Sequence, residues 1–464
     1  MIKEFINRII KNKLIGKAII VISSIILLYL LSSMYFINHF FFNTKVNGVD
    51  LSLKNYKEAN KILEESVKEY SIKIVGRDNR IEEIRGSYID LLFKEKDIIK
   101  EIKKDQNLFK WIASLINKKE YYIYGLVEFN EEMLVDEINS LDIVNKDIIE
   151  PVNVTFKYTN GVYEMVPEVY GNKINKNKLI KTIIDSVKKG NRLIDLDIET
   201  CYENPEYTMD CEKAIETKKL INQYISTKIT YLFGENKEEL SADIIYSWLT
   251  VDEDLNVVIN EKYLKEYIAN LGEKYNTVGI ERDFKTSIGK VIKVKGGYYG
   301  WKINSIAEEK MLLENIKLGA VLEKEPIYTQ KALYRDGDDI GNTYVEINIT
   351  RQYIWFYKEG KVVAEGSIVS GDPRKGYSTA LGTYMINYKQ KDAILKGPGY
   401  ETNVTYWMPF NGNIGIHDAS WRYSFGSNIY QNNGTHGCVN APISLAKKIY
   451  ENIDAGTPVI CYEE

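Results

Sequence analysis

Histidine and cysteine are scarce in this chain, whose 464 residues contain three histidines and four cysteines. So few cysteines cannot form a disulfide framework, and the fold must depend on packed cores. Cys201 and Cys211 stand on either side of a short loop, and the sequence leaves open both a disulfide between them and two separate thiols. The histidines and cysteines also form no Cys-x-x-Cys or His-x-x-x-His pair, the usual clamp of a zinc site.

An excess of positive charge is absent as well. The chain carries 61 basic and 65 acidic side chains; residues 1–17 hold five basic and one acidic, so the remainder has 56 and 64, a net charge of −8. A nucleic-acid-binding protein needs a basic surface, so we expect no nucleic-acid partner.

One stretch lacks charge altogether. Residues 18–43 contain no charged side chain, and this length exceeds the ~20 residues that cross a bilayer as a helix. Against a single acidic residue, Glu4, the preceding segment carries five basic ones: Lys3, Arg8, Lys11, Lys13 and Lys17. The positive-inside rule therefore predicts a cytoplasmic tail at 1–17, a transmembrane anchor at 18–43, and everything after about residue 44 outside the cytoplasm.

A cleaved signal peptide is the alternative interpretation of this stretch. Its apolar core would span ~7 to 15 residues and end in small residues at a cleavage site. The stretch here is longer and ends in three phenylalanines at 40–42. An uncleaved anchor is therefore favoured.

The strongest functional signal lies between His417 and Asn440. Two of the three histidines occur here beside a cysteine, in Thr435-His436-Gly437-Cys438-Val439-Asn440. A thiol with a nearby imidazole base is the minimum for covalent catalysis by cysteine. Two other interpretations stay open: His436 as the base in place of His417, and a zinc site made of these two histidines and Cys438.

The residues after Cys438 predict a helix. Pro442 opens a stretch with Leu445, Ile449 and Ile453 at helical spacing. Just before a helix N-terminus, the helix dipole and the free backbone amides lower the pKa of a thiol. We therefore expect Cys438 to favour the thiolate, with these amides and that of the preceding glycine available to hold an oxyanion.

The segments His417-Asp418-Ala419 and Thr435 to Asn440, with the spacer between them, resemble the signature of the L,D-transpeptidase (YkuD-like) catalytic domain. The resemblance extends upstream through residues 344–348 and 352–357 and Gly371. It covers residues 340–464, about the span of one domain.

The resemblance implies a role for each residue of the motif. Cys438 would be the nucleophile, His417 the general base, and the backbone carbonyl of Asp418 the group that orients His417. The oxyanion and substrate side would be shaped by Thr435, His436, Gly437 and Asn440. No cofactor and no metal are implied.

The resemblance also implies a reaction. Cys438 would be acylated by a peptidoglycan tetrapeptide stem with loss of D-alanine, and the side-chain amine of a second stem would resolve the thioester as a 3-3 cross-link. Two alternatives stay open, an L,D-carboxypeptidase or peptidoglycan hydrolase that uses water, and a non-catalytic wall-binding protein. The expected partners are peptide stems and the membrane, the expected location is the cell-wall side of the cell membrane, and carbapenems are the inhibitors to test.

An internal duplication precedes this domain. Residues 44–205 and 206–335 both predict a helix, a strand with a turn, a second helix and a tyrosine-containing strand, at 198–202 and 325–328. Both copies resemble the peptidoglycan-binding module that often precedes this catalytic domain. Two interpretations stay open: the tyrosines and Trp301 stack on sugars, or the modules are spacers with these aromatics in their cores.

Alternating apolar residues predict antiparallel strands in the catalytic domain, around Val345 to Ile349 and Tyr353 to Tyr357. Residues 389–413 predict a loop over the thiol, in which Tyr406 and Trp407 either cover the thiol or, as is commoner, pack at the rim. The predicted fold class is multidomain, with an N-terminal transmembrane helix, duplicated α+β modules, and a C-terminal, mostly β catalytic domain built as an antiparallel sheet or sandwich.

Overall fold

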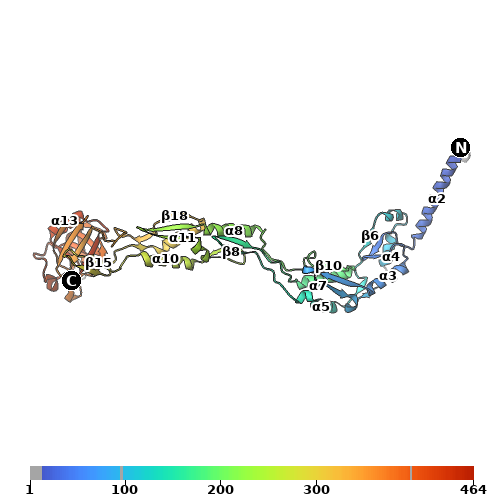
Figure 1. Cartoon of the computed structure of the whole chain (residues 1–464), viewed down its shortest axis with the longest axis horizontal. Coiled ribbons are helices and arrows are strands. Elements are labelled where there is room, and N and C mark those ends of the chain that lie inside the picture. Colours follow the sequence, from blue (N-terminus) through green and yellow to red (C-terminus); the bar gives the residue numbers. More distant parts are fainter. Residues whose placement is uncertain (1–12, 95–97, 398–399) are drawn as a thin grey trace. The chain divides into compact units, whose positions relative to one another are not determined.

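The computed structural model describes residues 13–94, 98–397 and 400–464 (Figure 1). The chain divides into two compact units, one made of residues up to 155 together with 166–211, the other of residues 156–165 and 212–464. The element order confirms the predicted multidomain architecture: an apolar N-terminal helix, mixed α and β repeats, and a β-rich C-terminal domain.

Helix α2 (Lys13–Tyr35) is the apolar N-terminal helix. It is long and apolar enough to cross a membrane, by length and composition alone. Its Leu, Ile and Val side chains are mostly exposed. An exposed helix without a polar face fits a lipid environment better than water.

The rest of the first unit consists of small sheets with helices packed on them. Its strands are β1 (Thr44–Val46), β2 (Val49–Asp50), β3 (Ser71–Val75), β4 (Ile81–Arg85), β5 (Leu92–Phe93), β6 (Lys119–Tyr121), β7 (Val127–Glu128) and β10 (Leu193–Asp195). Its helices are α3 (Tyr56–Lys68), α4 (Ile98–Asp105), α5 (Glu131–Ser140), α6 (Asp142–Asn145) and α7 (Lys176–Lys189), with 3-10 turns η1 (Arg77–Asn79), η2 (Gly86–Ile89) and η3 (Trp111–Leu115). Helix α3 begins at a reciprocal capping box formed by Asn55 and Glu58.

The second unit starts with a hairpin and a second repeat. The strands are β8 (Thr155–Thr159), β9 (Val162–Val166), β11 (Lys228–Phe233), β12 (Asn236–Leu240), β13 (Leu249–Val251), β14 (Val257–Ile259), β15 (Arg282–Lys285), β16 (Val291–Val294), β17 (Lys302–Ile303), β18 (Val321–Lys324) and β19 (Tyr328–Gln330). The helices are α8 (Glu212–Ile225), α9 (Ala242–Ile245), α10 (Glu261–Tyr275) and α11 (Ser305–Leu318), with the 3-10 turn η4 (Tyr246–Trp248).

The sheet topology confirms the predicted duplication. In the first repeat β3 pairs antiparallel with β4 and parallel with β10. In the second repeat β11 pairs antiparallel with β12 and parallel with β18. The helices α3, α5 and α7 precede and separate the strands of the first repeat in the same order as α8, α10 and α11 in the second.

The predicted tyrosine strand at 198–202 is wrong. Residues 197–200 form a turn, and the parallel strand of the repeat is β10, which ends at Asp195. The cause is local, because the Asp195 carboxylate accepts the backbone N–H groups of Asp197 and Ile198 and bends the chain.

Trp301 does not reach the surface, which decides between the two interpretations that the sequence left open for this residue. Its ring is buried in a core cluster with Tyr299, and its Nε1 donates a hydrogen bond to the Tyr334 carbonyl (2.6 Å). A buried indole whose only polar atom is already bonded has no face left for a sugar. For Trp301 the core interpretation therefore holds.

The catalytic domain has two sheets. Its strands are β20 (Tyr344–Asn348), β21 (Tyr353–Lys358), β22 (Lys361–Ser367), β23 (Gly382–Met385), β24 (Gln390–Gly397), β25 (Tyr400–Asn411), β26 (Ile414–Asp418), β27 (Val439–Ala441) and β28 (Pro458–Tyr462). Its helices are α12 (Ile429–Asn433) and α13 (Ile443–Asn452), with the 3-10 turn η5 (Pro373–Lys375). The sheet orders are β22-β21-β20-β28-β23 and β24-β25-β26-β27, and α13 packs against strands of both.

The predicted loop at 389–413 is instead a β-hairpin, β24 and β25. Ala393, Val404 and Trp407 are buried together in one cluster, and Cys438 packs against them. This tertiary packing favours a paired sheet over an open loop. Trp407 thus packs beside the thiol, whereas Tyr406 packs against the main core of the domain and against Tyr450, so both residues have the packing role that the sequence left open.

The β15–β16 hairpin of the second repeat packs on the catalytic sheet. Phe284 and Val294 join Ile460 and Tyr462 of β28 in one core cluster. Beyond the hairpin, Gly297 lies so close to the backbone of Thr383 that a Cβ atom would stand 2.0 Å from its carbonyl oxygen. Only glycine permits this approach of two backbones.

Candidate active site

His417 lies on strand β26, with its ring almost fully buried. Its Nδ1 is 2.8 Å from the backbone carbonyl oxygen of Asp418. A carbonyl oxygen only accepts hydrogen bonds, so Nδ1 carries the proton and Nε2 is left with its lone pair. Burial lowers the pKa of His417, and the hydrogen bond to the Asp418 carbonyl opposes this only in part. The lowered pKa keeps the ring neutral at neutral pH.

The Asp418 carboxylate is directed elsewhere. Its Oδ1 accepts the backbone N–H of Tyr406 on strand β25 at 2.6 Å, and the side chain is buried. The carboxylate thus fixes the two strands together, while the carbonyl of the same residue contacts the imidazole. The carbonyl and not the carboxylate of Asp418 is therefore the group that lies next to the imidazole.

Cys438 stands at the end of a tight turn held by threonines. The Thr435 hydroxyl donates to the Cys438 carbonyl (2.6 Å) and accepts the Gly437 N–H (3.0 Å). The Thr379 hydroxyl donates to the Gly437 carbonyl (2.8 Å). Gly437 has φ +115°, a conformation that favours glycine. These bonds fix the backbone that carries the thiol.

The expected lowering of the thiol pKa is wrong. Cys438 is followed by strand β27, and helix α13 begins only at Ile443. The field of a helix dipole falls off within its first turn, so it does not reach the sulfur. Burial raises the pKa of Cys438 to about 11, although a hydrogen bond from the Gly415 N–H opposes this. The resting group is a thiol, and the Gly437 N–H is already bonded to Thr435.

His417 and Cys438 line the same cavity, whose volume is about 220 Å³. Strand pairing causes this, because β26 and β27 are parallel neighbours with His417 opposite Asn440. The other lining residues are Leu395, Thr402, Trp421, Arg422, Gly434, Thr435, His436 and Asn440. The structure therefore brings together Cys438, His417, Thr435, His436 and Asn440, with Gly437 in the turn between them.

His436 and Asn440 occupy different positions in this cavity. His436 is exposed, and its ring packs against Tyr377 with centroids 4.6 Å apart. Asn440 is buried, and its Oδ1 has no hydrogen-bond partner within the part of the chain that the structure describes. A buried amide oxygen of this kind is suited to accept a hydrogen bond from a bound ligand.

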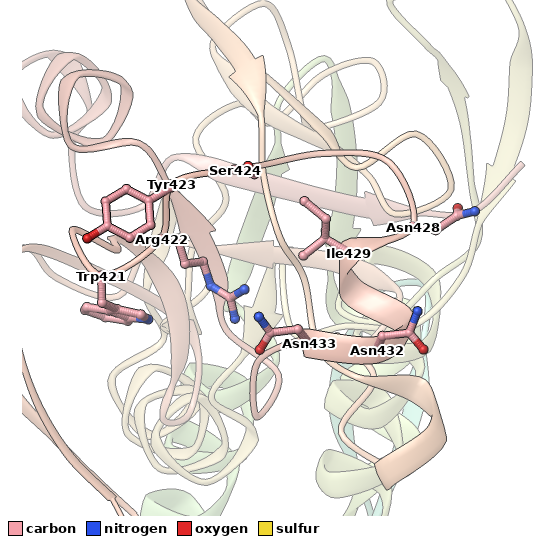
Figure 2. Close-up of a pocket in the computed structure, with 8 residues that line it drawn as sticks. All are labelled: Trp421, Arg422, Tyr423, Ser424, Asn428, Ile429, Asn432 and Asn433. Atoms are coloured by element: carbon pink, nitrogen blue, oxygen red, sulfur yellow. The ribbon is translucent and has the colours of Figure 1, made fainter.

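A second, larger cavity of about 740 Å³ adjoins the first (Figure 2). Its lining residues are Trp421, Arg422, Tyr423, Ser424, Asn428, Ile429, Asn432 and Asn433, so Trp421 and Arg422 border both cavities. Figure 2 shows the Arg422 guanidinium between the two aromatic side chains and the asparagines of α12. Arg422 Nε is buried and has no hydrogen-bond partner among the described residues.

Sequence reasoning missed Trp421 and Arg422. The available signal was their position four and five residues after His417, in a loop rich in serine, glycine and asparagine. An aromatic–arginine pair in such a loop is typical of a binding surface.

The cysteines and histidines are not arranged as a metal centre. Among residues 13–94, 98–397 and 400–464, no group of three or more His, Cys, Asp or Glu side chains is placed to hold a metal ion. No disulfide joins Cys201 to Cys211 in this part of the chain. Cys201 and Cys461 are buried, which fits packed side chains.

Two protein families match the chain. The L,D-transpeptidase catalytic domain family (YkuD) matches residues 342–461. The family described as "Putative peptidoglycan binding domain" matches residues 87–195 and 208–320. The first match contains the cavity residues, and the other two fall on the repeats. No curated protein sequence matches the chain.

Solved structures are also similar. The crystal structure of a cysteine-to-serine mutant of the Enterococcus faecium L,D-transpeptidase is 33% identical over 53% of this chain and 100% of that one, with a TM-score of 0.44. The Ldtfm–avibactam carbamoyl enzyme is 33% identical over 54% and 99%, with a TM-score of 0.45. The E. faecium catalytic domain acylated by ertapenem is 39% identical over 26% and 97%, with a TM-score of 0.25. The chain is 33% identical to such an enzyme over that enzyme's whole length and carries the catalytic domain at residues 342–461, so it belongs to the L,D-transpeptidase family.

Proposed function

We propose that this protein is a membrane-anchored L,D-transpeptidase that forms 3-3 cross-links in peptidoglycan, with Cys438 as nucleophile and His417 as general base. The observation that carries the proposal is one cavity lined by the thiol and by an imidazole whose Nδ1 contacts the Asp418 carbonyl. A nucleophile, a base and a group that orients the base are the parts that covalent catalysis requires.

Acylation starts from the neutral pair. His417 Nε2 takes the thiol proton as Sγ attacks the carbonyl carbon between the third residue of a tetrapeptide stem and its terminal D-alanine. The C–N bond breaks, His417 returns the proton to the departing amine, and a thioester remains on Cys438. Because burial raises the pKa of Cys438, proton transfer to His417 accompanies the attack instead of preceding it.

The second stem resolves the thioester. Its side-chain amine attacks the thioester carbonyl, His417 accepts the proton that the amine loses, and the C–S bond breaks to regenerate the thiol. A reaction between two stems needs room for both, and the two cavities that share Trp421 and Arg422 supply it. Asn440 Oδ1 would accept a stem N–H, and the backbone around Gly437 and Cys438 would face the developing oxyanion.

The anchor and the repeats would set the location. Lys13 and Lys17 at the start of α2 keep the N-terminus in the cytoplasm, so the catalytic domain works on the cell-wall side of the membrane. The repeats would contribute contacts to peptidoglycan. The boundaries 44–205, 206–335 and 340–464 are proposed as the domains.

The test uses the purified full chain in detergent with a disaccharide-tetrapeptide, followed by mass spectrometry. We expect loss of D-alanine, an acyl-enzyme at Cys438 and a 3-3 dimer, none of which forms with Cys438→Ala. Cys211→Ala is the matched control and should leave all three intact. Tripeptide without dimer would instead support a carboxypeptidase, and the absence of any acyl-enzyme would favour a wall-binding protein. Carbapenem adducts on Cys438 would be measured in the same way, since a relative is acylated by ertapenem.

A further inference from the structure

Residues 109–116, here called the juxtamembrane segment, lie along the last turns of α2. The Tyr29 hydroxyl donates to the Phe109 carbonyl (2.7 Å), and Trp111 Nε1 donates to Ser33 Oγ (3.1 Å). The Trp111 ring also stacks on Tyr29 and on Phe36, with centroids 6.0 and 5.5 Å apart. Hydrogen bonds and stacked rings together fix the segment to the helix.

The helix contacts set the depth of this segment. A helix needs ~20 residues to cross the ~30 Å apolar core of a bilayer. Counted from Lys17, the last charged residue before the apolar stretch, such a span ends near residue 37. Tyr29, Ser33 and Phe36 therefore lie in its outer half, and residues attached to them lie within the outer leaflet.

The juxtamembrane segment presents apolar side chains away from the protein. Phe109 is 60% exposed, Ile112 51%, Leu115 51% and Ile116 87%. Four large apolar residues exposed within eight positions are unusual on a surface in contact with water. Trp111 of the same segment is partly covered because it faces α2.

Basic residues flank the apolar ones. Lys110 and Lys118 are exposed, and Lys119 pairs with Asp105 at 3.3 Å. Apolar side chains bordered by lysines are the pattern of elements that lie in the membrane interface, where the ammonium groups reach anionic headgroups.

We propose that the juxtamembrane segment is a second membrane contact, with Phe109, Ile112, Leu115 and Ile116 inserted into the outer leaflet beside α2. This proposal rests on the proposed anchoring by α2. The apolar surface is continuous with a helix that spans the bilayer, so lipid is the partner that covers both. Two contacts instead of one would hold the first repeat at a fixed orientation to the membrane surface.

The test places one fluorophore at a time on the full chain in vesicles of phosphatidylglycerol and phosphatidylethanolamine. Cys201 and Cys461 are buried, so the background carries Cys211→Ser and Cys438→Ala to leave one reactive thiol. An environment-sensitive label goes to Ile116→Cys, to Ile26→Cys on α2, or to Ile198→Cys, an isoleucine 77% exposed in the same unit. Lipids with spin labels in their acyl chains quench only labels within the bilayer.

We expect blue-shifted emission and loss of fluorescence at positions 26 and 116, and neither at 198. Adding Leu115→Asp should weaken the quenching at 116 and leave that at 26 unchanged. Quenching at 26 without quenching at 116 overturns the proposal while the anchor stands. A label at 116 that is shielded from aqueous iodide but not reached by the lipid quencher assigns the surface to a second protein copy and also overturns it. If the label at position 26 is not quenched, both the anchor and this proposal are overturned.

Discussion

The catalytic domain has buried polar side chains on two faces, the cavity that holds Cys438 and the surface under the β15–β16 hairpin. Under the hairpin, the buried Glu346 carboxylate accepts hydrogen bonds from Ser287 and from the Tyr462 hydroxyl. Arg282 and Asp339 form a buried bidentate pair, at 2.8 and 2.9 Å. Each of these charged groups is hydrogen-bonded to, or ion-paired with, another residue of the protein.

In the cavity more of the buried polar groups lack such partners, whereas near the hairpin the hydroxyl of Thr383 is a buried group without a hydrogen-bond partner among the described residues. Asn440 Oδ1 and Arg422 Nε are buried, and neither has a hydrogen-bond partner in the described part of the chain. An unpaired buried polar atom costs about 1–3 kcal/mol. A protein that keeps two of them beside a thiol and an imidazole gives up stability where a ligand binds. The comparison predicts that substitutions in the cavity change the reaction, and substitutions under the hairpin change the stability.

The largest effect is expected at His417. His417→Gln removes the proposed base, and acylation by a tetrapeptide should slow by about 10²–10⁴-fold, the usual contribution of a general base. The melting temperature should change little. Acyl-enzyme formation is followed by mass spectrometry, with His436→Gln as the matched control. A loss with His436→Gln as large as that with His417→Gln would transfer the role of base to His436.

Breaking the buried pair under the hairpin comes next. Arg282→Met leaves the Asp339 carboxylate buried without its cation, which should lower the free energy of unfolding by about 3–5 kcal/mol. Lys228→Met, in the exposed pair Lys228–Glu239 of the same unit, should cost about 0–1 kcal/mol. Urea unfolding of both variants gives the comparison. Equal losses of unfolding free energy in the two variants would show that burial of the ion pair does not matter. A slower reaction in folded Arg282→Met would contradict the assignment of stability to the hairpin face and of reactivity to the cavity.

A smaller effect is expected at Arg422. If its guanidinium binds a carboxylate of a stem peptide, Arg422→Met should raise KM by about 10- to 100-fold with little change in kcat, since a charged hydrogen bond contributes about 1.5–3 kcal/mol. Arg374→Met, at an exposed arginine of the same domain, is the control. A fall in kcat at unchanged KM would place Arg422 in the chemical step instead.

The smallest effect is a displacement of the pH profile. Burial lowers the pKa of His417 below 6.5, so the neutral base persists at mildly acidic pH and is lost only as the pH falls through the lowered pKa. The acid limb of kcat/KM should therefore have its midpoint below 6.5. The rate of Cys438 alkylation by iodoacetamide should rise with pH towards about 11. A plateau of alkylation at neutral pH would mean that a thiolate is already present.

Much of this site could be predicted from the sequence, because its chemistry lies in one short segment. The spacing from His417 to Cys438 singled out both side chains, and parallel pairing of β26 with β27 is what brings them into one cavity. The thiol pKa could not be predicted, since it depends on which element follows Cys438. A three-residue strand between the cysteine and Pro442 was enough to separate the sulfur from the helix.

The fold shows the same division. The capped start of α3 at Asn55 and the order of elements in the repeats follow from local patterns. The burial of Trp301 in a core cluster depends on long-range packing, and so does the formation of the β24–β25 hairpin. Composition does not encode such packing. The glycine- and aromatic-rich composition of residues 389–413 favoured a loop. These residues form a sheet because Ala393, Val404 and Trp407 are buried against one another.

The contact between His417 Nδ1 and the Asp418 carbonyl has a consequence for how this enzyme tolerates mutation. Every residue type carries a backbone carbonyl, so no single substitution at position 418 deletes the atom that touches the imidazole. In the proposed mechanism, an alanine scan would register two catalytic positions where three groups act. A substitution at position 418 can weaken the pairing of strand β26 with β25, because the carboxylate bond to the Tyr406 N–H is lost. It cannot remove the backbone carbonyl that contacts His417.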